Sequence, residues 1–321
     1  MLPAALKAAL DAELEGVSRR DLAARAAATS AAYRGGGTSA AVIRDRADAL
    51  AYALVRLPAT YAAGAAALAE ARRTAPTFAP RSLLDAGSGP GGGSWAAVET
   101  WPSLRAVTWL DASAPFLALA ATLAAGGPEP LPRATEQRAD LKGAALPTAD
   151  AVLVSYALAE IAAARQAEVV SSLWQACAGV LALVEPGTPA GYARILAARD
   201  TLIAAGATIL APCPHEAACP LAAPDWCHFS VRLARSRDHL AAKSAEVPFE
   251  DEKFAYLIAA RPHVAVQPRS PRVLAPPQAA KPGITLKLCT AAGLERRFVA
   301  RRDKAGYAKA RRLDWGDALG L

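Results

Sequence analysis

Apolar residues recur at helical intervals in the first quarter of the chain. In the run TSAAVIRDRADALAYALVRL, the positions that share this spacing are Val42, Ala49, Leu50, Leu54 and Leu57. Pro58 interrupts the pattern, and the Pro-containing stretch TAPTFAP closes the Ala-rich region. We therefore predict a helical N-terminal subdomain over residues 1–79, with no visible chemistry of its own.

Short apolar runs alternate with helical segments after residue 80. The runs Ser82–Leu84, Ala106–Leu110, ADAVLVSYAL and AGVLALVEPG have the length and composition of strands. The helical segment AEIAAARQAEVVSSLWQACA separates the last two, and we expect Cys177 to be a buried apolar residue within it. Such alternation predicts a doubly wound α/β sheet within residues 80–262.

A glycine-rich loop follows the first of these strands. Its motif D-x-G-x-G-x-G comprises Asp85, Gly87, Gly89 and Gly91. Glycines at these places let the backbone turn sharply off a strand and approach a ligand closely, as in nucleotide-binding βα turns. Asp111 ends the second strand, where a carboxylate accepts hydrogen bonds from both hydroxyls of a ribose.

These residues resemble the cofactor motifs of class I S-adenosylmethionine-dependent methyltransferases. The resemblance implies that the glycine loop from Asp85 to Gly91 lines the methionine and ribose of S-adenosylmethionine, with Asp111 at the ribose hydroxyls. It also implies that Asp140, in RADLKG, contacts the adenine. An NAD site is the competing interpretation, but GPGGGS does not fit the G-x-G-x-x-G pattern of that site.

The sequence contains fewer motifs for the methyl-transfer step than for cofactor binding. Enzymes of this class that methylate the amino groups of bases carry an Asn/Asp-Pro-Pro-aromatic quartet after the fourth strand, and here that position is SYALAEI, residues 155–161. Glu160 and Glu185 are the nearby carboxylates, for which we expect solvent-facing or structural roles. We assign no catalytic base.

Composition sets the class of protein. A chain of 321 residues with 53% apolar and 20% charged residues is typical of a folded globular protein. No stretch reaches the roughly 18 uncharged apolar residues of a membrane span. The start, MLPAALKAALDAELEG, lacks the order of a signal or transit peptide, so we expect a cytoplasmic, reducing location. In such a location, clustered cysteines are more often metal ligands or catalytic groups than disulfides.

Three of the five cysteines fall within CPHEAACPLAAPDWCHF, residues 213–229. Five residues separate Cys213 from Cys219, and seven separate Cys219 from Cys227. With Cys177 set aside, the one remaining cysteine is Cys289, in the strand-like GITLKLCT. A site closed by Cys289 would tie the C-terminal segment to loop 212–228, so that metal binding would contribute to folding.

Spacing and residue type leave two interpretations of the metal at these cysteines. Thiolate-rich sites select zinc or iron–sulfur clusters, and His215 and His228 are available for a mixed zinc site. The close C-x(2–4)-C pairs typical of structural zinc are absent from the loop. Wide cysteine spacing is compatible with a bulkier cluster.

Positive charge concentrates near the C-terminus. Between residues 281 and 312 only Glu295 and Asp303 are acidic, against ten basic residues: Lys281, Lys287, Arg296, Arg297, Arg301, Arg302, Lys304, Lys309, Arg311 and Arg312. The resulting excess of eight exceeds the net charge of +7 of the whole chain. A basic stripe with interspersed aromatic residues suits a nucleic-acid backbone, and a solvated basic surface is the alternative.

Five segments in combination carry a family resemblance: LPATYAA, LLDAGSGPG, PCPHEAACPL with DWCHF, KPGITLKLC and RRDKAGYAKARRLDWGD. Together they resemble the methyltransferase-like family of the small ribosomal subunit, known in mitochondria as an assembly factor and widespread in bacteria. The resemblance covers nearly the whole chain. It implies a [4Fe-4S] cluster on four cysteines, which here are Cys213, Cys219, Cys227 and Cys289.

The resemblance also implies a partner, namely the RNA of the small ribosomal subunit during maturation. Residues 263–321 are then a basic C-terminal extension that supplies Cys289 and contacts rRNA through segment 281–312. Two further hypotheses stay open. One is a non-catalytic assembly factor that uses cofactor and cluster structurally, and the other is a small-molecule methyltransferase with a zinc loop.

Overall fold

Five helices open the chain. The computed structural model describes residues 1–243 and 245–319. The first helices are α1 (Ala4–Leu14), α2 (Arg19–Arg34), α3 (Ser39–Val42), α4 (Arg46–Val55) and α5 (Leu57–Thr74). Asp45 caps α4 by accepting a hydrogen bond from the amide of Asp48 at 2.8 Å. Pro58 lies in the first turn of α5, where its missing N–H costs nothing, so the interrupted pattern marks the junction of two helices.

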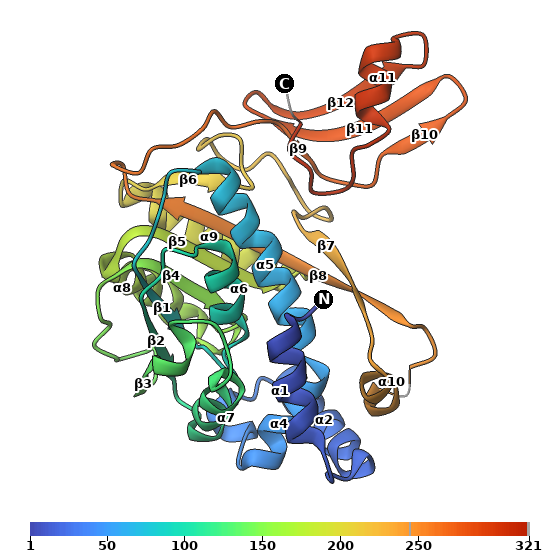
Figure 1. The fold of residues 1–321 in the computed structure, drawn as a ribbon. Coiled ribbons are helices and arrows are strands. Elements are labelled where there is room, and N and C mark those ends of the chain that lie inside the picture. Colours follow the sequence, from blue (N-terminus) through green and yellow to red (C-terminus); the bar gives the residue numbers. More distant parts are fainter. Residues whose placement is uncertain (244, 320–321) are drawn as a thin grey trace.

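A large mixed sheet follows these helices (Figure 1). Its strands lie in the order β3-β2-β1-β4-β5-β8-β6, and β7 pairs with β8. The bounds are β1 (Ser82–Ala86), β2 (Ala106–Asp111), β3 (Thr135–Arg138), β4 (Ala149–Ser155), β5 (Cys177–Pro186), β6 (Thr208–Ala211), β7 (Phe229–Ala234) and β8 (Phe249–Ala260). Strands β1 to β5 are parallel, and β8 is antiparallel to both of its neighbours β5 and β6.

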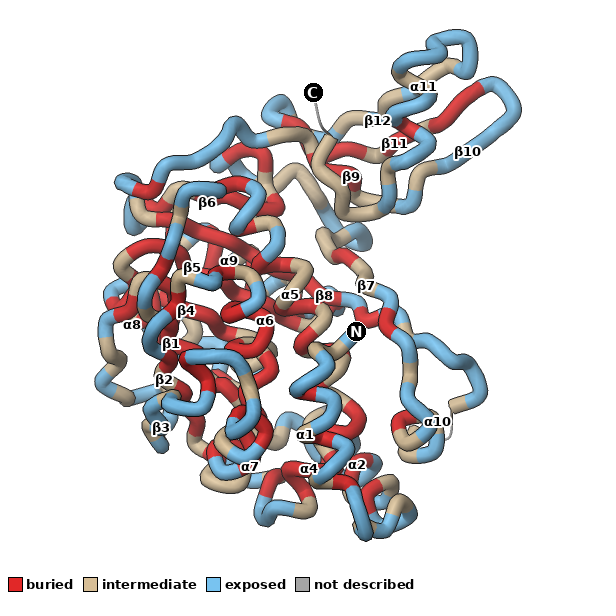
Figure 2. The backbone as a smooth tube through the Cα atoms, viewed as in Figure 1, coloured by how far each residue is buried: buried red, intermediate tan, exposed pale blue. Residues whose placement is uncertain are grey.

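Helices cover both faces of this sheet. With α5, they are α6 (Gly92–Thr100) and α7 (Ala114–Ala124) on one face, and α8 (Ala163–Ala176) and α9 (Pro189–Ala204) on the other. The short 3₁₀ turns are η1 (Leu131–Arg133) and η2 (Leu158–Glu160), and the helix α10 (Arg237–Lys243) packs against α2 and α4. Successive strand residues point to opposite faces. Leu83 accordingly packs with α5 and α6 in one core, and Leu84 packs with α8 and α9 in the other. Figure 2 shows strands β1, β4 and β5 buried along most of their length.

The predicted fold class is confirmed. Parallel strands β1 to β5, connected through helices and joined by one antiparallel strand, form the class I methyltransferase arrangement of a doubly wound α/β sheet. One local prediction was wrong, because Cys177 is the first residue of β5 and not part of a helix. Helix α8 ends one residue earlier, and Cys177 pairs with Ala149 of β4. Its predicted burial holds, since it is 1% exposed.

The basic C-terminal segment folds as a small unit of its own. Its strands are β9 (Arg272–Val273), β10 (Gln278–Ala280), β11 (Gly283–Thr290) and β12 (Gly293–Ala300), and helix α11 (Lys304–Ala310) packs on one face of the sheet. Figure 1 shows this unit extending from the β6 end of the large sheet. The buried Arg272 joins the two units through an ion pair with Glu70 of α5, at 2.6 Å. Among the described residues, no helix is long and apolar enough to span a bilayer.

Candidate functional site

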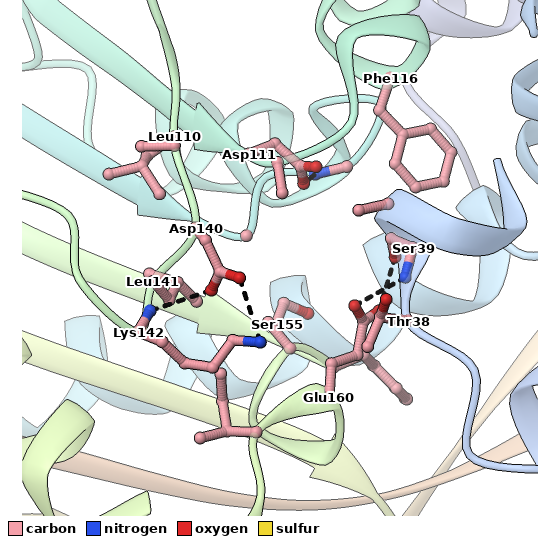
Figure 3. Close-up of a pocket in the computed structure, with 18 of the residues that line it drawn as sticks. Thr38, Ser39, Leu110, Asp111, Phe116, Asp140, Leu141, Lys142, Ser155 and Glu160 are labelled. Carbon is pink, nitrogen blue, oxygen red and sulfur yellow. Dashed lines mark hydrogen bonds and ion pairs between the residues drawn. The ribbon is translucent and has the colours of Figure 1, made fainter. Parts of the chain in front are cut away.

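A pocket opens at the carboxyl ends of β1, β2 and β4 (Figure 3). In open α/β sheets, ligands bind at these strand ends. Four of the residues singled out in the sequence line the pocket, namely Gly87, Gly89, Asp111 and Asp140. The structure thus brings the loops after β1, β2 and β3 together around one cavity.

The glycine loop owes its path to backbone angles that other residues adopt only with strain. Gly87 has φ 75° and Gly89 has φ 53°. A Cβ atom on Gly87 would lie 2.5 Å from the Cβ of Ala157, so the site has no room for a side chain there. The Gly87 amide donates a hydrogen bond to the carbonyl of Leu110 at 2.7 Å, which holds the loop against β2.

Asp111 anchors the same loop from the second strand. Its carboxylate accepts hydrogen bonds from the amides of Gly89 and Ser113, both at 2.8 Å. Burial raises the pKa of Asp111, and these backbone bonds act in the opposite direction. A carboxylate held in this way keeps acceptor lone pairs for a ligand that donates two hydroxyl hydrogen bonds.

Asp85 and Gly91 lie behind the loop and do not line the pocket. Asp85 belongs to β1 and is 1% exposed. It accepts a hydrogen bond from the Ser94 hydroxyl at 2.7 Å, and that hydroxyl accepts one from the indole N–H of Trp109 at 3.0 Å. Gly91 caps α6 with φ 83°. Both residues therefore fix the turn from strand to helix that presents Gly87 and Gly89.

The buried Asp85 predicts a measurable pH dependence of stability. Burial raises its pKa from 3.8 to about 6, so the folded chain binds this proton more tightly than the unfolded chain. The stabilisation is complete below pH 4 and is lost as the pH rises through 6. We expect the unfolding free energy of Asp85→Asn relative to the natural chain to shift by about 2 kcal/mol, in favour of the variant, between pH 4 and pH 7. Urea unfolding at both pH values measures the shift, and a constant difference would contradict it.

The N-terminal helices supply part of the pocket wall. Thr38 and Ser39 reach it from the start of α3, and Tyr52 reaches it from α4. The amide of Ser39 donates a hydrogen bond to Glu160 Oε2 at 2.7 Å, and its hydroxyl donates to the other oxygen of the same carboxylate. Glu160, predicted to be structural or solvent-facing, thus joins η2 to the N-terminal helices. Nothing in the local sequence pattern signals this contact.

Asp140 and Lys142 line another part of the pocket and form a charged pair there. Asp140 accepts a hydrogen bond from the amide of Lys142 at 3.0 Å and forms an ion pair with its ammonium group at 3.1 Å. The backbone bond and the ammonium group together lower the pKa of Asp140, so this carboxylate is ionised at neutral pH. Glu185, the other carboxylate considered, is fully buried and paired with Arg194 at 2.6 Å.

Tyr156 occupies the position after β4 where the amine-gripping quartet would lie. Its φ of 61° is left-handed, a strained value for a residue with a side chain. The hydroxyl donates a hydrogen bond to Glu252 of β8 at 2.8 Å, and Arg56 holds the same carboxylate at 3.1 Å. The Tyr156 hydroxyl is thereby engaged with β8, which leaves the aromatic ring in the pocket wall.

A second pocket lies between the two folded units and is lined by the four remaining cysteines. Cys213 follows β6, Cys219 and Cys227 lie in the loop before β7, and Cys289 lies in β11. The structure therefore brings together four thiols separated by up to 76 residues along the chain. Burial raises the pKa of Cys213 and Cys227, and raises that of Cys289 to about 12.

Polar groups surround these thiols. The buried Arg199 and Arg272 both line the pocket, and the Nε of Arg199 has no hydrogen-bond partner. The Tyr192 hydroxyl lies 3.2 Å from the sulfur of Cys219. His215 Nε2 lies 3.7 Å from the sulfur of Cys289, whereas the ring of His228 stacks on Trp226 at 4.8 Å between centroids. Two buried guanidinium groups suit a site that carries negative charge.

The four thiols are not arranged around a single ion. Within residues 1–243 and 245–319, no group of three or more His, Cys, Asp or Glu side chains could hold one metal ion. Tetrahedral zinc requires its ligands at about 2.0–2.3 Å from one point.

Two sequence comparisons match most of this chain. A family model described as "Mitochondrial small ribosomal subunit Rsm22" matches residues 46–320. The human "Ribosome assembly protein METTL17, mitochondrial" is 33% identical over 287 residues, which are 84% of this chain and 62% of that protein. The chain thus spans less than two thirds of the length of this relative.

Solved structures with a similar backbone include two methyltransferases. Magnesium protoporphyrin IX methyltransferase (ChlM) from Synechocystis PCC 6803 with bound SAM is 17% identical over 63% of this chain and 78% of its own, with a TM-score of 0.40. Human N-acetylserotonin methyltransferase (ASMT) in complex with SAM is 12% identical over 72% of this chain and 61% of its own, with a TM-score of 0.43.

Proposed function

Because the chain belongs to the family described as mitochondrial small ribosomal subunit Rsm22, we propose that it binds the small ribosomal subunit and acts in its assembly. The observation that carries this proposal is the match over residues 46–320, which includes the methyltransferase fold, the cysteine loop and the basic unit. The name of the human relative, a ribosome assembly protein, supports it.

We propose S-adenosylmethionine as the ligand of the first pocket. Gly87 and Gly89 leave space for a ligand to approach the backbone, and Asp111 is placed to accept the ribose hydroxyls. Asp140 lies on the adenine side, with Lys142 as its partner. When bound, the cofactor supplies an activated methyl group. Asp111 anchors the glycine loop through the amide of Gly89. Residues of the N-terminal helices form a wall that shields the pocket from water.

We also propose that the second pocket holds a [4Fe-4S] cluster on Cys213, Cys219, Cys227 and Cys289. Support comes from four cysteines lining one pocket, from the buried arginines, and from the unpartnered Nε of Arg199, which is available to a negatively charged group. The cluster would fasten β11 to the cysteine loop.

The basic segment 281–312 is the proposed contact with ribosomal RNA. Of its ten cationic side chains, Lys287 pairs with Asp225 and Arg297 pairs with Glu295. In the described part of the chain, the other eight have no acidic group within 4.0 Å. Unpaired surface cations bind phosphates with a steep dependence on salt, because binding releases counterions from the RNA.

One observation favours a non-catalytic role as the second candidate. The segment after β4 lacks the amine-gripping quartet, and the Tyr156 hydroxyl and the Glu160 carboxylate that lie there are already engaged by Glu252 and Ser39. An assembly factor would then use the bound cofactor as a structural element.

Gradient sedimentation with isolated small subunits tests the proposal. We expect the natural chain to migrate with the subunits at about 50 mM salt and to dissociate near 200 mM, because the contacts are mainly to phosphates. Asp111→Ala should still migrate with the subunits, since Asp111 lies in the pocket and not on the basic unit. Loss of a mapped rRNA methyl group in that variant would favour catalysis over the structural role. A natural chain that stays free at low salt would contradict the proposal.

A further inference from the structure

The small C-terminal sheet has one covered face and one face that α11 leaves open. Ile284, Leu286 and Leu288 of β11 point toward α11 and form the core with Val273 and Ala310. Side chains alternate along a strand, so the intervening residues lie on the other face. In cross-strand pairs, these are Gly283 with Ala300, Thr285 with Phe298, Lys287 with Arg296, and Cys289 with Leu294.

An exposed aromatic ring lies at the centre of the open face. Phe298 is 54% exposed, the most of any aromatic residue in the described chain. A Cβ atom built on Gly283 would meet the outer ring atoms of Phe298 at 2.7 and 2.8 Å. The ring therefore lies across the neighbouring strand and does not extend into solvent. Gly283 makes this position possible because it has no side chain to displace the ring.

Positive charge surrounds this ring. Arg296 is exposed and lies two residues before Phe298 on the same face, directly opposite Lys287. Lys287 forms an ion pair with Asp225 of the cysteine loop, so Arg296 is the member of this pair that has no acidic group within 4.0 Å in the described part of the chain. At the other side of the ring, the exposed Lys281 lies in the turn before Gly283, and the amide of Arg301 bonds to the carbonyl of Pro282 in that turn. The guanidinium of Arg301 itself lies over the ring of Tyr307 of α11, 5.9 Å from the ring centroid, on the covered side of the sheet.

We propose that this open face is a platform for single-stranded RNA, on which Phe298 stacks a base while Arg296 and Lys281 contact phosphates. An exposed aromatic ring lying on an antiparallel sheet and flanked by cations is the arrangement by which sheets bind unpaired bases. A paired base inside a duplex offers no free face for stacking. The proposal rests on the proposed association with ribosomal RNA. It adds two statements: the bound RNA is unpaired, and the residues named here bind it.

Binding of a labelled oligouridine of about 12 nucleotides to the full chain, measured by fluorescence anisotropy, tests the platform. We expect Phe298→Ala and Phe298→Leu to weaken binding about 10-fold, and Phe298→Tyr to stay within about twofold of the natural chain, because stacking requires a ring. Arg296→Ala should reduce the slope of log affinity against log salt by about 0.7. Arg133→Ala, which removes an exposed arginine of the other unit, should change the slope by much less.

The outcomes separate this inference from the proposed function. Equal binding by Phe298→Ala and the natural chain, equal binding by the leucine and tyrosine variants, or an equally strong and Phe298-dependent affinity for duplex RNA would each overturn the platform. If the chain still sediments with subunits in a salt-sensitive way in those cases, the proposed function is supported although the platform is not. If Phe298→Ala loses affinity for intact subunits but not for free RNA, the face binds a ribosomal protein, which also overturns the platform.

Discussion

Replacing Cys289 with serine is expected to remove bound iron and to release the C-terminal unit from the methyltransferase unit. Cys289 is the one proposed ligand that comes from β11, and the three others lie in the loop after β6. Loss of a ligand weakens a metal site by at least about 100-fold, since even the loss of an outer hydrogen bond costs about 10–100-fold. The binding free energy of the cluster is also folding free energy for the segments it joins.

Iron and sulfide per chain, together with limited proteolysis of the segment between β8 and β10, measure this effect. We expect Cys289→Ser to lose most of its iron and to be cleaved faster in that segment. Cys177→Ala is the matched control, because Cys177 is equally buried but lies in β5 and does not line the cysteine pocket. Iron retained by Cys289→Ser, or lost equally from Cys177→Ala, would contradict the four-cysteine site.

The second large effect concerns the cofactor pocket. Asp111→Ala should weaken S-adenosylmethionine binding by about 100-fold or more. Each hydrogen bond to a charged group contributes about 1.5–3 kcal/mol, and the carboxylate is placed to accept two from the ribose. The substitution also frees the amide of Gly89, so the glycine loop loses one of its anchors. Titration calorimetry with the methylated and demethylated cofactor measures both contributions together.

Asp150→Ala is the control for loop anchoring in general. Asp150 also accepts two backbone hydrogen bonds, from the amides of Arg81 and Ser82 at 2.7 and 3.1 Å. It does so at the amino end of β1, away from the pocket. We expect this variant to be less stable but to bind the cofactor with unchanged affinity. Equal loss of affinity in both variants would mean that Asp111 acts only through the stability of the fold.

The sequence revealed the parts of the fold that depend on local pattern. Apolar runs ending in Gly or Asp predicted the strands with Asp85 and Asp111, because a buried parallel strand is continuously apolar and its ligand-binding residues follow it directly. The four cysteines were grouped by residue type alone, and the structure places them in one pocket. The second case rests on a residue type that occurs only five times in the chain.

Other features depend on contacts that no local pattern contains. Strand β8 begins with the charged run FEDEK and returns antiparallel after the excursion through β7 and α10, so periodicity alone did not indicate its central position. Ser39 reaches the pocket only because α3 packs against η2 through Glu160. Cys177 was assigned to the preceding helix because Ala-rich sequence continues across the boundary between α8 and β5.

The central claim, that the four-cysteine pocket holds an iron–sulfur cluster joining a methyltransferase fold to an RNA-binding unit, is tested most directly by spectroscopy. The full chain, purified without oxygen, should show a broad brown absorbance and contain about four iron and four sulfide per molecule. The same sample should contain little zinc. A colourless protein with one zinc per chain would keep the fold but contradict the cluster.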